Sequence, residues 1–229
     1  MKTVRLVLFA LSAGVMFTGC DIFKDWDEDD SLSLERTLEY QPDGANGVDA
    51  GLFSCVDCGY STRNFGNIKE FSAIATTNAG SSNARALIRF DLSNIPDGAI
   101  ITSATLSLYY AHSDGNGDHR YQWGSNSCKL QRVTSPWDEH TVTWNTQPSV
   151  SSTNQVILPA STTETQDYPD INVTKLIQDI IADQSKNYGM MLRLQTEEIY
   201  RQLIFASSDH PDATKHPKLV VKYKKRITQ

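Results

Sequence analysis

Beyond its first 20 residues the chain lacks an apolar run long enough to cross a bilayer as a helix, which takes about 20 residues. It also has little net charge in its folded part. Residues 31–229 carry a formal charge of −3, too weak and too mixed to indicate nucleic acid as a partner. Internal repeats and Gly-rich phosphate-binding loops are missing too, which argues against solenoid folds and against nucleotide-binding enzymes of that type.

Cysteine is scarce, with four residues in the whole chain. Cys20 belongs to the N-terminal segment, so Cys55, Cys58 and Cys128 remain for the folded part, enough for one disulfide and one free thiol in an oxidising compartment. The Cys-Val-Asp-Cys spacing of residues 55–58 also occurs in redox and zinc motifs. Neither a βαβ pattern nor a second cysteine pair accompanies it, so the sequence favours a structural disulfide, with simply buried thiols as the alternative.

The N-terminal segment, residues 1–19, has the marks of a signal peptide: positive residues Lys2 and Arg5, then a short apolar run. Residues 16–20 (Met-Phe-Thr-Gly-Cys) resemble the lipobox of bacterial lipoproteins, in which the cysteine is acylated and becomes the mature N-terminus. Phe17 stands where Leu is usual. The resemblance implies export and lipid anchoring to a membrane through Cys20. The alternative is an ordinary secretory signal with a chance cysteine.

An acidic run follows, because residues 21–30 hold six acidic side chains against Lys24 alone. Like charges repel one another and stay solvated, so we expect residues 20–35 to be a lipidated acidic stalk. The run also resembles the acidic tags that send some lipoproteins to the outer face of the outer membrane. We therefore expect an outer-membrane lipoprotein at the cell surface; the alternatives are a plain spacer and inner-membrane retention signalled by Asp21.

Residues 36–226 show mostly the period-two apolar pattern of strands. Alternation is clearest at 84–92, 100–110 and 189–195, and we expect further strands at 37–41, 48–53, 69–77, 202–208 and 217–223. One short helix is expected after an N-cap at Thr174, with an apolar stripe over residues 176–181. This pattern, without βα alternation, predicts a single all-β domain, a jelly-roll-like two-sheet β-sandwich with one short helix.

Several segments, in order, carry a family resemblance: residues 85–96 (RALIRFDLSNIP), 101–109 (ITSATLSLY), 137–148 (WDEHTVTWNTQP), 187–189 (NYG), 205–208 (FASS) and 217–221 (PKLVV). Over residues 40–224 the chain resembles the DNRLRE domain, also classed as carbohydrate-binding module family 96; Asn64-Phe65-Gly66 stands where that family often has Asn-Tyr-Gly. The resemblance implies a jelly-roll sandwich that binds polysaccharide, alginate in some members. The chain departs from the family around Cys55 and Cys58 and in an insert at residues 113–126, where ligand loops could vary.

Outward-facing side chains of the expected strands suggest a site for an anionic glycan. Arg85, Arg89, Tyr109 and Arg193 would form a polar floor if their strands lie side by side. Guanidinium forks hold carboxylates bidentately, so such a floor suits a uronic acid polymer. Arg63 and Lys69 flank the Asn-Phe-Gly loop and would extend it. The alternative is that these arginines keep a sheet soluble or pair with Asp91 and Glu197.

Tryptophan offers a second kind of contact, because aromatic faces stack on sugar rings. Trp123 lies in the polar insert, where an aromatic is more often functional than in a strand, and we expect it to contact ligand. Trp137 and Trp144 belong to the pattern shared with the family, so packing is the favoured role for them.

The insert also holds the alternating oxygens of a calcium loop at Asp114, Asn116 and Asp118. His119 stands at the sixth position, where such loops need Gly, and Ser125 at the twelfth, where they need Glu. A Gly-rich hairpin turn explains the segment at least as well. We expect no cofactor, with calcium as the alternative.

Catalytic signals are weak. None of the five histidines has a Ser or Cys nucleophile motif beside it. Jelly-roll polysaccharide lyases carry a Gln-Ile-His or Gln-Val-His strand, and neither is present. We therefore expect non-catalytic binding of an anionic polysaccharide such as alginate. The alternatives are a structural or adhesive surface module that binds protein or matrix, and a lyase.

Overall fold

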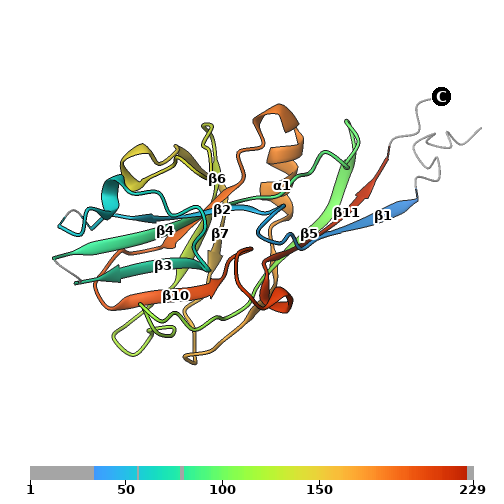
Figure 1. Cartoon of the computed structure of the whole chain (residues 1–229). Coiled ribbons are helices and arrows are strands. Elements are labelled where there is room, and N and C mark those ends of the chain that lie inside the picture. The colour runs from blue at the N-terminus through green and yellow to red at the C-terminus, as the bar shows by residue number, and fades with distance from the viewer. Residues whose placement is uncertain (1–33, 56, 78–79, 226–229) are drawn as a thin grey trace, which may run out of the picture. The chain divides into compact units, whose positions relative to one another are not determined.

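The computed structural model describes residues 34–55, 57–77 and 80–225, and within these ranges eleven strands form two antiparallel sheets (Figure 1). The four-stranded sheet consists, in order, of β1 (Glu35–Tyr40), β11 (Lys218–Lys224), β5 (Ile100–Leu108) and β8 (Tyr168–Asn172). The seven-stranded sheet consists of β10 (Arg201–Ala206), β3 (Glu70–Thr76), β4 (Ser82–Arg89), β9 (Met190–Leu194), β6 (Cys128–Val133) and β7 (Val150–Leu158), with β2 (Val48–Phe53) also paired to β4. The predicted signal peptide and Cys20 lie outside the described residues.

β4 organises the larger sheet because it pairs with three strands. All of β2 pairs with one edge of β4, from Val48 opposite Arg89 to Phe53 opposite Ala84. The other edge is shared: the start of β4 pairs with β3 and its later part with β9. Beyond β4 the sheet therefore divides into one branch of β3 and β10 and another of β9, β6 and β7. The ends of β2, β3 and β4 come together (Figure 1).

The main core lies between the two sheets, as a β-sandwich requires. Apolar side chains from both sheets meet there, including Ile88 and Leu192 from one and Leu106 and Val221 from the other. The period-two predictions for β4, β5 and β9 are confirmed by these inward-facing residues.

The single α-helix in the described part of the chain, α1 (Thr174–Ile181), covers this core with Leu176, Ile177 and Ile180. The prediction that Thr174 caps the helix is wrong, because Val173 is the N-cap residue. The Thr174 hydroxyl instead accepts a hydrogen bond of 2.9 Å from the Ala104 amide, which fastens the helix to β5. No helix in the described ranges is long and apolar enough to span a membrane.

Three strands, β6, β7 and β8, were not expected from the sequence. β7 is a mostly exposed edge strand, so it has little apolar alternation to recognise. β8 is a short edge strand that contains Pro169, which only an edge position tolerates readily. Four single-turn 3₁₀ helices complete the connections: η1 (Tyr60–Thr62), η2 (Trp144–Thr146), η3 (Gln184–Lys186) and η4 (Ala213–Lys215).

Candidate functional site

The predicted arginine floor is closed by internal contacts. Arg85 on β4 and Arg193 on β9 lie close together, and both reach Glu197: Arg85 Nε lies 2.8 Å from Oε1, and Arg193 Nη2 lies 3.2 Å from the same oxygen. A second Arg85–Glu197 hydrogen bond and one to Gln147 Oε1, of 3.0 and 2.6 Å, complete the fork. The Arg85 guanidinium also lies 4.5 Å from the centre of the Trp144 ring. Arg85 and Arg193 therefore pair with Glu197, which was the alternative to a glycan-binding role.

The segment of residues 134–149 covers the same face. Trp137 is buried in a second apolar cluster and donates its indole N–H to the Tyr188 carbonyl over 2.8 Å. The Arg89 guanidinium lies 5.5 Å from the centre of its ring. Tyr109 does not join this face, because it follows β5 in the other sheet. The expectation of one floor of four residues is thus wrong; we call Arg85, Arg89 and Arg193 the arginine face.

The cysteines divide as one pair and one thiol. Cys55 and Cys58 form a disulfide in the loop after β2. Cys128 is a free cysteine, fully buried on β6, and burial raises the pKa of its thiol because a thiolate would lose its hydration. This arrangement agrees with the expectation of one disulfide and one spare thiol, and Cys55 of the disulfide lines the edge of a pocket.

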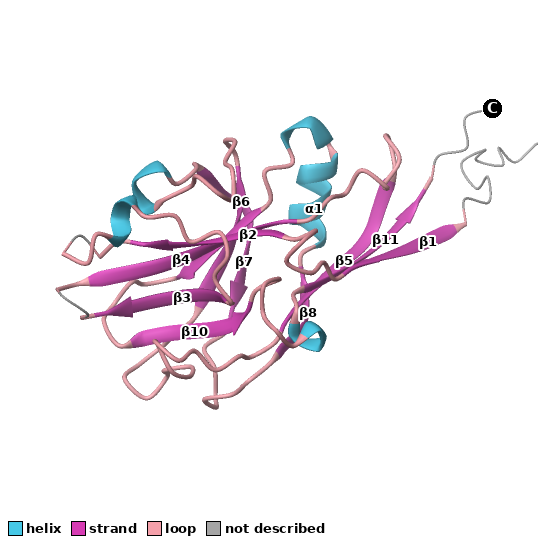
Figure 2. Cartoon of the chain, viewed as in Figure 1, coloured by secondary structure: helices cyan, strands magenta, loops and turns pink. Residues whose placement is uncertain are grey.

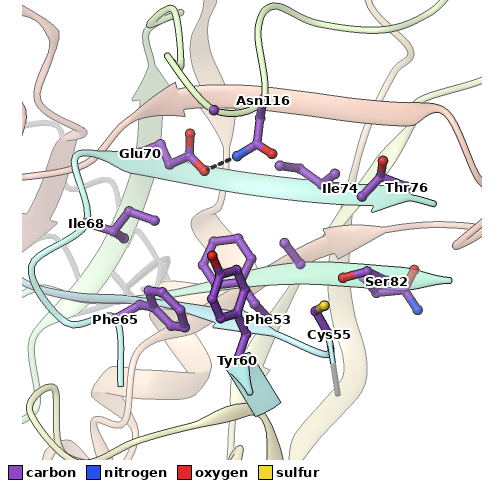
Figure 3. A pocket seen from close by; sticks show the side chains of 13 residues that line it. Phe53, Cys55, Tyr60, Phe65, Ile68, Glu70, Ile74, Thr76, Ser82 and Asn116 are labelled. Atoms are coloured by element: carbon purple, nitrogen blue, oxygen red, sulfur yellow. Dashed lines mark hydrogen bonds between the residues drawn. The ribbon is translucent and has the colours of Figure 1, made fainter. Parts of the chain in front are cut away.

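This aromatic pocket, of about 250 Å³, opens where the ends of β2, β3 and β4 meet (Figure 3). Phe53, Tyr60 and Phe65 form one wall, with every pair of rings in an edge-to-face arrangement and centroids 4.7 to 6.4 Å apart. Ile74 and Ala84, which pack with Ile204, line the pocket from the sheet. The result is a concave, mainly apolar surface with a few polar groups around it, which is typical of small-ligand sites.

The Asn-Phe-Gly loop gives this wall its rigidity. Asn64 donates its side-chain amide to the carbonyls of Glu139 and Val142 over 2.7 and 2.8 Å. At Gly66 a Cβ atom would lie 2.2 Å from the Glu139 carbonyl oxygen, so no larger residue fits without movement. Asn64 and Gly66 therefore hold the loop, while Phe65 between them faces the pocket (Figure 3).

Polar groups occupy the opposite side of the pocket (Figure 3). Glu70 is 8% exposed, and its Oε1 accepts a hydrogen bond of 2.7 Å from the Asn116 side-chain amide. Burial raises the pKa of the Glu70 carboxyl, because desolvation disfavours its charged form more than its hydrogen bonds stabilise it. Glu70 can thus accept hydrogen bonds from ligand hydroxyls, and Asn116 comes from the insert that departs from the family pattern.

Two predicted cations, Arg63 and Lys69, neighbour residues of this pocket but do not line it. The Arg63 guanidinium is 5.2 Å from the centre of the Phe65 ring. Lys69 is exposed and lies between the lining residues Ile68 and Glu70. Among the described residues neither side chain forms an ion pair, whereas Arg85 and Arg193 both do. Arg63 and Lys69 therefore remain available to a bound anion.

The insert, residues 113–126, has a loop conformation and lies between β5 and β6 in the chain (Figure 2). Two of its three calcium candidates, Asn116 and Asp118, point to different partners. Asn116 turns to Glu70, and the Asp118 carboxylate accepts from the Tyr110 hydroxyl and lies 2.8 Å from His112 Nδ1. In the residues described by the structure, no group of three or more His, Cys, Asp or Glu side chains is placed to hold a metal ion. Calcium at Asp114, Asn116 and Asp118 stays an untested alternative to the expectation of no cofactor.

Sequence reasoning named Arg63 and Lys69 but missed Phe53, Tyr60 and Glu70. Tyr60 is an aromatic residue in a connection between strands, which is the criterion that identified Trp123 as a candidate ligand contact. Trp123 itself lies outside the aromatic pocket, beside Tyr200, with ring centroids 5.7 Å apart.

Comparison with protein families shows where the chain belongs. The family model of carbohydrate-binding module family 96 matches residues 54–223, which contain most of the sandwich and all of the aromatic pocket except Phe53. β1 and β2 precede the matched segment, although both pair with strands inside it. A search of curated proteins gives no match.

Proposed function

This chain belongs to carbohydrate-binding module family 96, and we propose that its aromatic pocket holds a sugar unit of an anionic polysaccharide, a uronic acid polymer such as alginate. The observation that carries the proposal is the wall of Phe53, Tyr60 and Phe65, with the Arg63 guanidinium 5.2 Å from the centre of the Phe65 ring. Aromatic side chains offer apolar area and a defined geometry for the C–H faces of a pyranose ring.

Polar groups supply orientation. The Glu70 side chain offers an oxygen that accepts hydrogen bonds in both its charged and its neutral form, and a pyranose presents hydroxyl donors around its rim. With a volume of about 250 Å³ the pocket is below the usual size for drug-like ligands, so it suits one monosaccharide of a longer chain.

Charge supports the anionic preference. Exposed guanidinium–carboxylate contacts contribute roughly 0.2–1 kcal/mol each, so Arg63 and Lys69 alone give modest affinity. Several sugar units along one polymer raise it by avidity. Affinity should therefore increase with chain length and fall as salt screens the charges.

The test is titration of the purified protein with alginate and with a neutral β-glucan, each at low and at high salt. We expect stronger binding to alginate at low salt and loss of that preference in the Arg63→Ala, Lys69→Ala double variant. Arg36→Ala, Lys222→Ala is a matched control, since both residues are exposed on the four-stranded sheet. Equal binding to both polymers, unmoved by salt, would overturn the anionic preference.

We propose that binding occurs without turnover. Among the described residues that line the pocket, Glu70 is the one carboxylate, whereas glycoside hydrolysis ordinarily uses a pair. Incubation of alginate with the protein should give no ultraviolet absorbance from unsaturated uronate and no new reducing ends. Appearance of either product, lost in Glu70→Gln, would establish an enzyme instead.

We also propose that the domain is exported and anchored by lipid on Cys20, at the outer membrane and facing the cell exterior. The lipobox-like residues 16–20 and the acidic run after them support this. Cys20→Ala should move the protein from the membrane fraction to the soluble fraction and abolish labelling by a fatty-acid probe. A variant that keeps both membrane association and lipid label contradicts the anchor.

A further inference from the structure

Two aromatic side chains outside the aromatic pocket lie together at the surface. Trp123 in the insert is 67% exposed and Tyr200, just before β10, is 37% exposed. Their ring centroids are 5.7 Å apart and their planes are inclined by 47°. We call this pair the aromatic platform. Exposed aromatic groups of this size commonly mark a binding surface.

The backbone holds Tyr200 in an unusual conformation. Its φ angle is 63°, in the left-handed region that bulky residues rarely adopt. The Tyr200 amide donates to the Ala75 carbonyl over 2.7 Å, and its hydroxyl lies 3.3 Å from Thr77 Oγ1. Contacts with the end of β3 therefore fix the ring at the surface, and backbone strain held in this way is common at functional sites.

Buried polar residues fix the Trp123 loop at both of its ends. His119 is 1% exposed, and its ring accepts the Ile204 amide over 3.0 Å. Asn126 is fully buried, donates to Ser161 Oγ over 2.8 Å and accepts from the Ser161 amide over the same distance. A loop tied to the sheet by satisfied buried polar groups is preorganised, so Trp123 loses little conformational freedom on binding.

A broad groove of about 650 Å³ lies beside Trp123. Arg120, Gln122 and Glu164 line it with donors and acceptors, and Gln122 Nε2 contacts Glu164 Oε1 at 2.5 Å. Such a combination of a flat aromatic face and neighbouring hydrogen-bonding groups matches a pyranose, which has apolar C–H faces and a rim of hydroxyls. An apolar protein segment would leave the polar groups of the groove without partners.

We propose that the aromatic platform is a second carbohydrate-binding site, which stacks on a pyranose ring irrespective of the charge of the sugar. This proposal rests on the family membership of the chain, and the platform is separate from the aromatic pocket. The two sites share the insert, since Asn116 lines the pocket and Trp123 lies seven residues further on. A polysaccharide that spans both is held at two points and gains affinity by avidity.

The test is affinity for alginate and for a neutral β-glucan, measured with Trp123→Ala and with Trp123→Phe. Trp123→Ala should weaken binding of both polymers about tenfold, which corresponds to about 1.4 kcal/mol, and to the same extent at low and high salt. Trp123→Phe, which keeps an aromatic face, should retain most of the affinity. Ile100→Ala is the matched control, because Ile100 is also a large exposed apolar residue but lies on the four-stranded sheet.

The outcomes separate the two sites. Unchanged affinity of Trp123→Ala for both polymers overturns the platform and leaves the pocket proposal standing. Loss of alginate binding alone, with a steep salt dependence, also overturns it, because stacking is indifferent to ligand charge. A loss for both polymers in Trp123→Ala together with no effect of the Arg63→Ala, Lys69→Ala double variant overturns the anionic pocket and supports the platform.

Discussion

The arginine face and the aromatic pocket combine the same residue types on one sheet, yet one is closed and the other open. On the arginine face, Glu197 and the Trp144 ring satisfy Arg85, and the side chains of Arg85 and Glu197 are 14% and 16% exposed. At the pocket, Arg63 lies over the Phe65 ring and stays exposed, without an ion pair among the described residues.

This difference shows what decides whether an arginine of this chain stabilises the fold or is available to bind a ligand. An arginine whose fork is filled by a carboxylate from its own chain contributes to stability, since a ligand would have to displace that partner. An arginine that only stacks on an aromatic ring keeps its donors for a ligand. The two regions should therefore respond in opposite ways to substitution, one in unfolding free energy and the other in affinity.

The largest effect is expected on the arginine face. Arg85→Ala leaves Glu197 and Gln147 without their main partner, so we expect the free energy of unfolding to fall by about 3 kcal/mol. Denaturant unfolding measures this, and the exposed Arg36→Ala is the control. The folded variant should bind alginate as the parent does. Retained stability with lost binding would move the site to the arginine face.

The next effect is expected at the pocket. Phe65→Ala removes one ring of the aromatic wall, and we expect an approximately tenfold loss of affinity for alginate, or about 1.4 kcal/mol. Phe65→Tyr keeps the ring and is the matched control. Calorimetric titration of both variants at equal folded fraction gives the comparison. If Phe65→Ala binds alginate as tightly as the parent, the aromatic pocket is not the binding site.

The smallest effect concerns pH. Because burial raises the pKa of Glu70 above 4.5, the side chain takes up its proton at a higher pH than an ordinary glutamate, and the neutral form repels a uronate less. Affinity for alginate should rise by about threefold, the size of one exposed charge contact, as the pH falls from neutral through that pKa. Glu70→Gln should bind at the higher level throughout. A pH dependence that survives in Glu70→Gln would assign it to another group.

Much of the fold could be predicted because it follows from alternation. β2 has the predicted bounds, and the inward residues of β4, β5 and β9 form the core as expected. β7 and β8 were missed because edge strands bury little on either face, so their sequences show weak periodicity. The helix was predicted, but Thr174 was wrongly assigned as its N-cap. The Thr174 hydroxyl instead accepts a hydrogen bond from β5, and the two residues are 70 positions apart, so the local sequence does not indicate this contact.

The site was harder to predict because it depends on contacts between distant segments. Arg85 and Glu197 are 112 residues apart in sequence, so nothing local indicates that the arginine is already paired. The pocket likewise joins Phe53 and Tyr60 to Asn116 from the insert. The sequence did identify both segments as departures from the family pattern. The structure adds that the two meet in one place.

The most direct measurement is backbone amide hydrogen exchange with and without alginate oligosaccharides, which compares the two regions in one experiment. We expect slower exchange on binding in the segment that carries Tyr60 and Phe65 and in the insert, with no change in residues 134–149 or around Glu197. Protection of residues 134–149 and Glu197, with none around Phe65, would identify the arginine face, and not the aromatic pocket, as the glycan site.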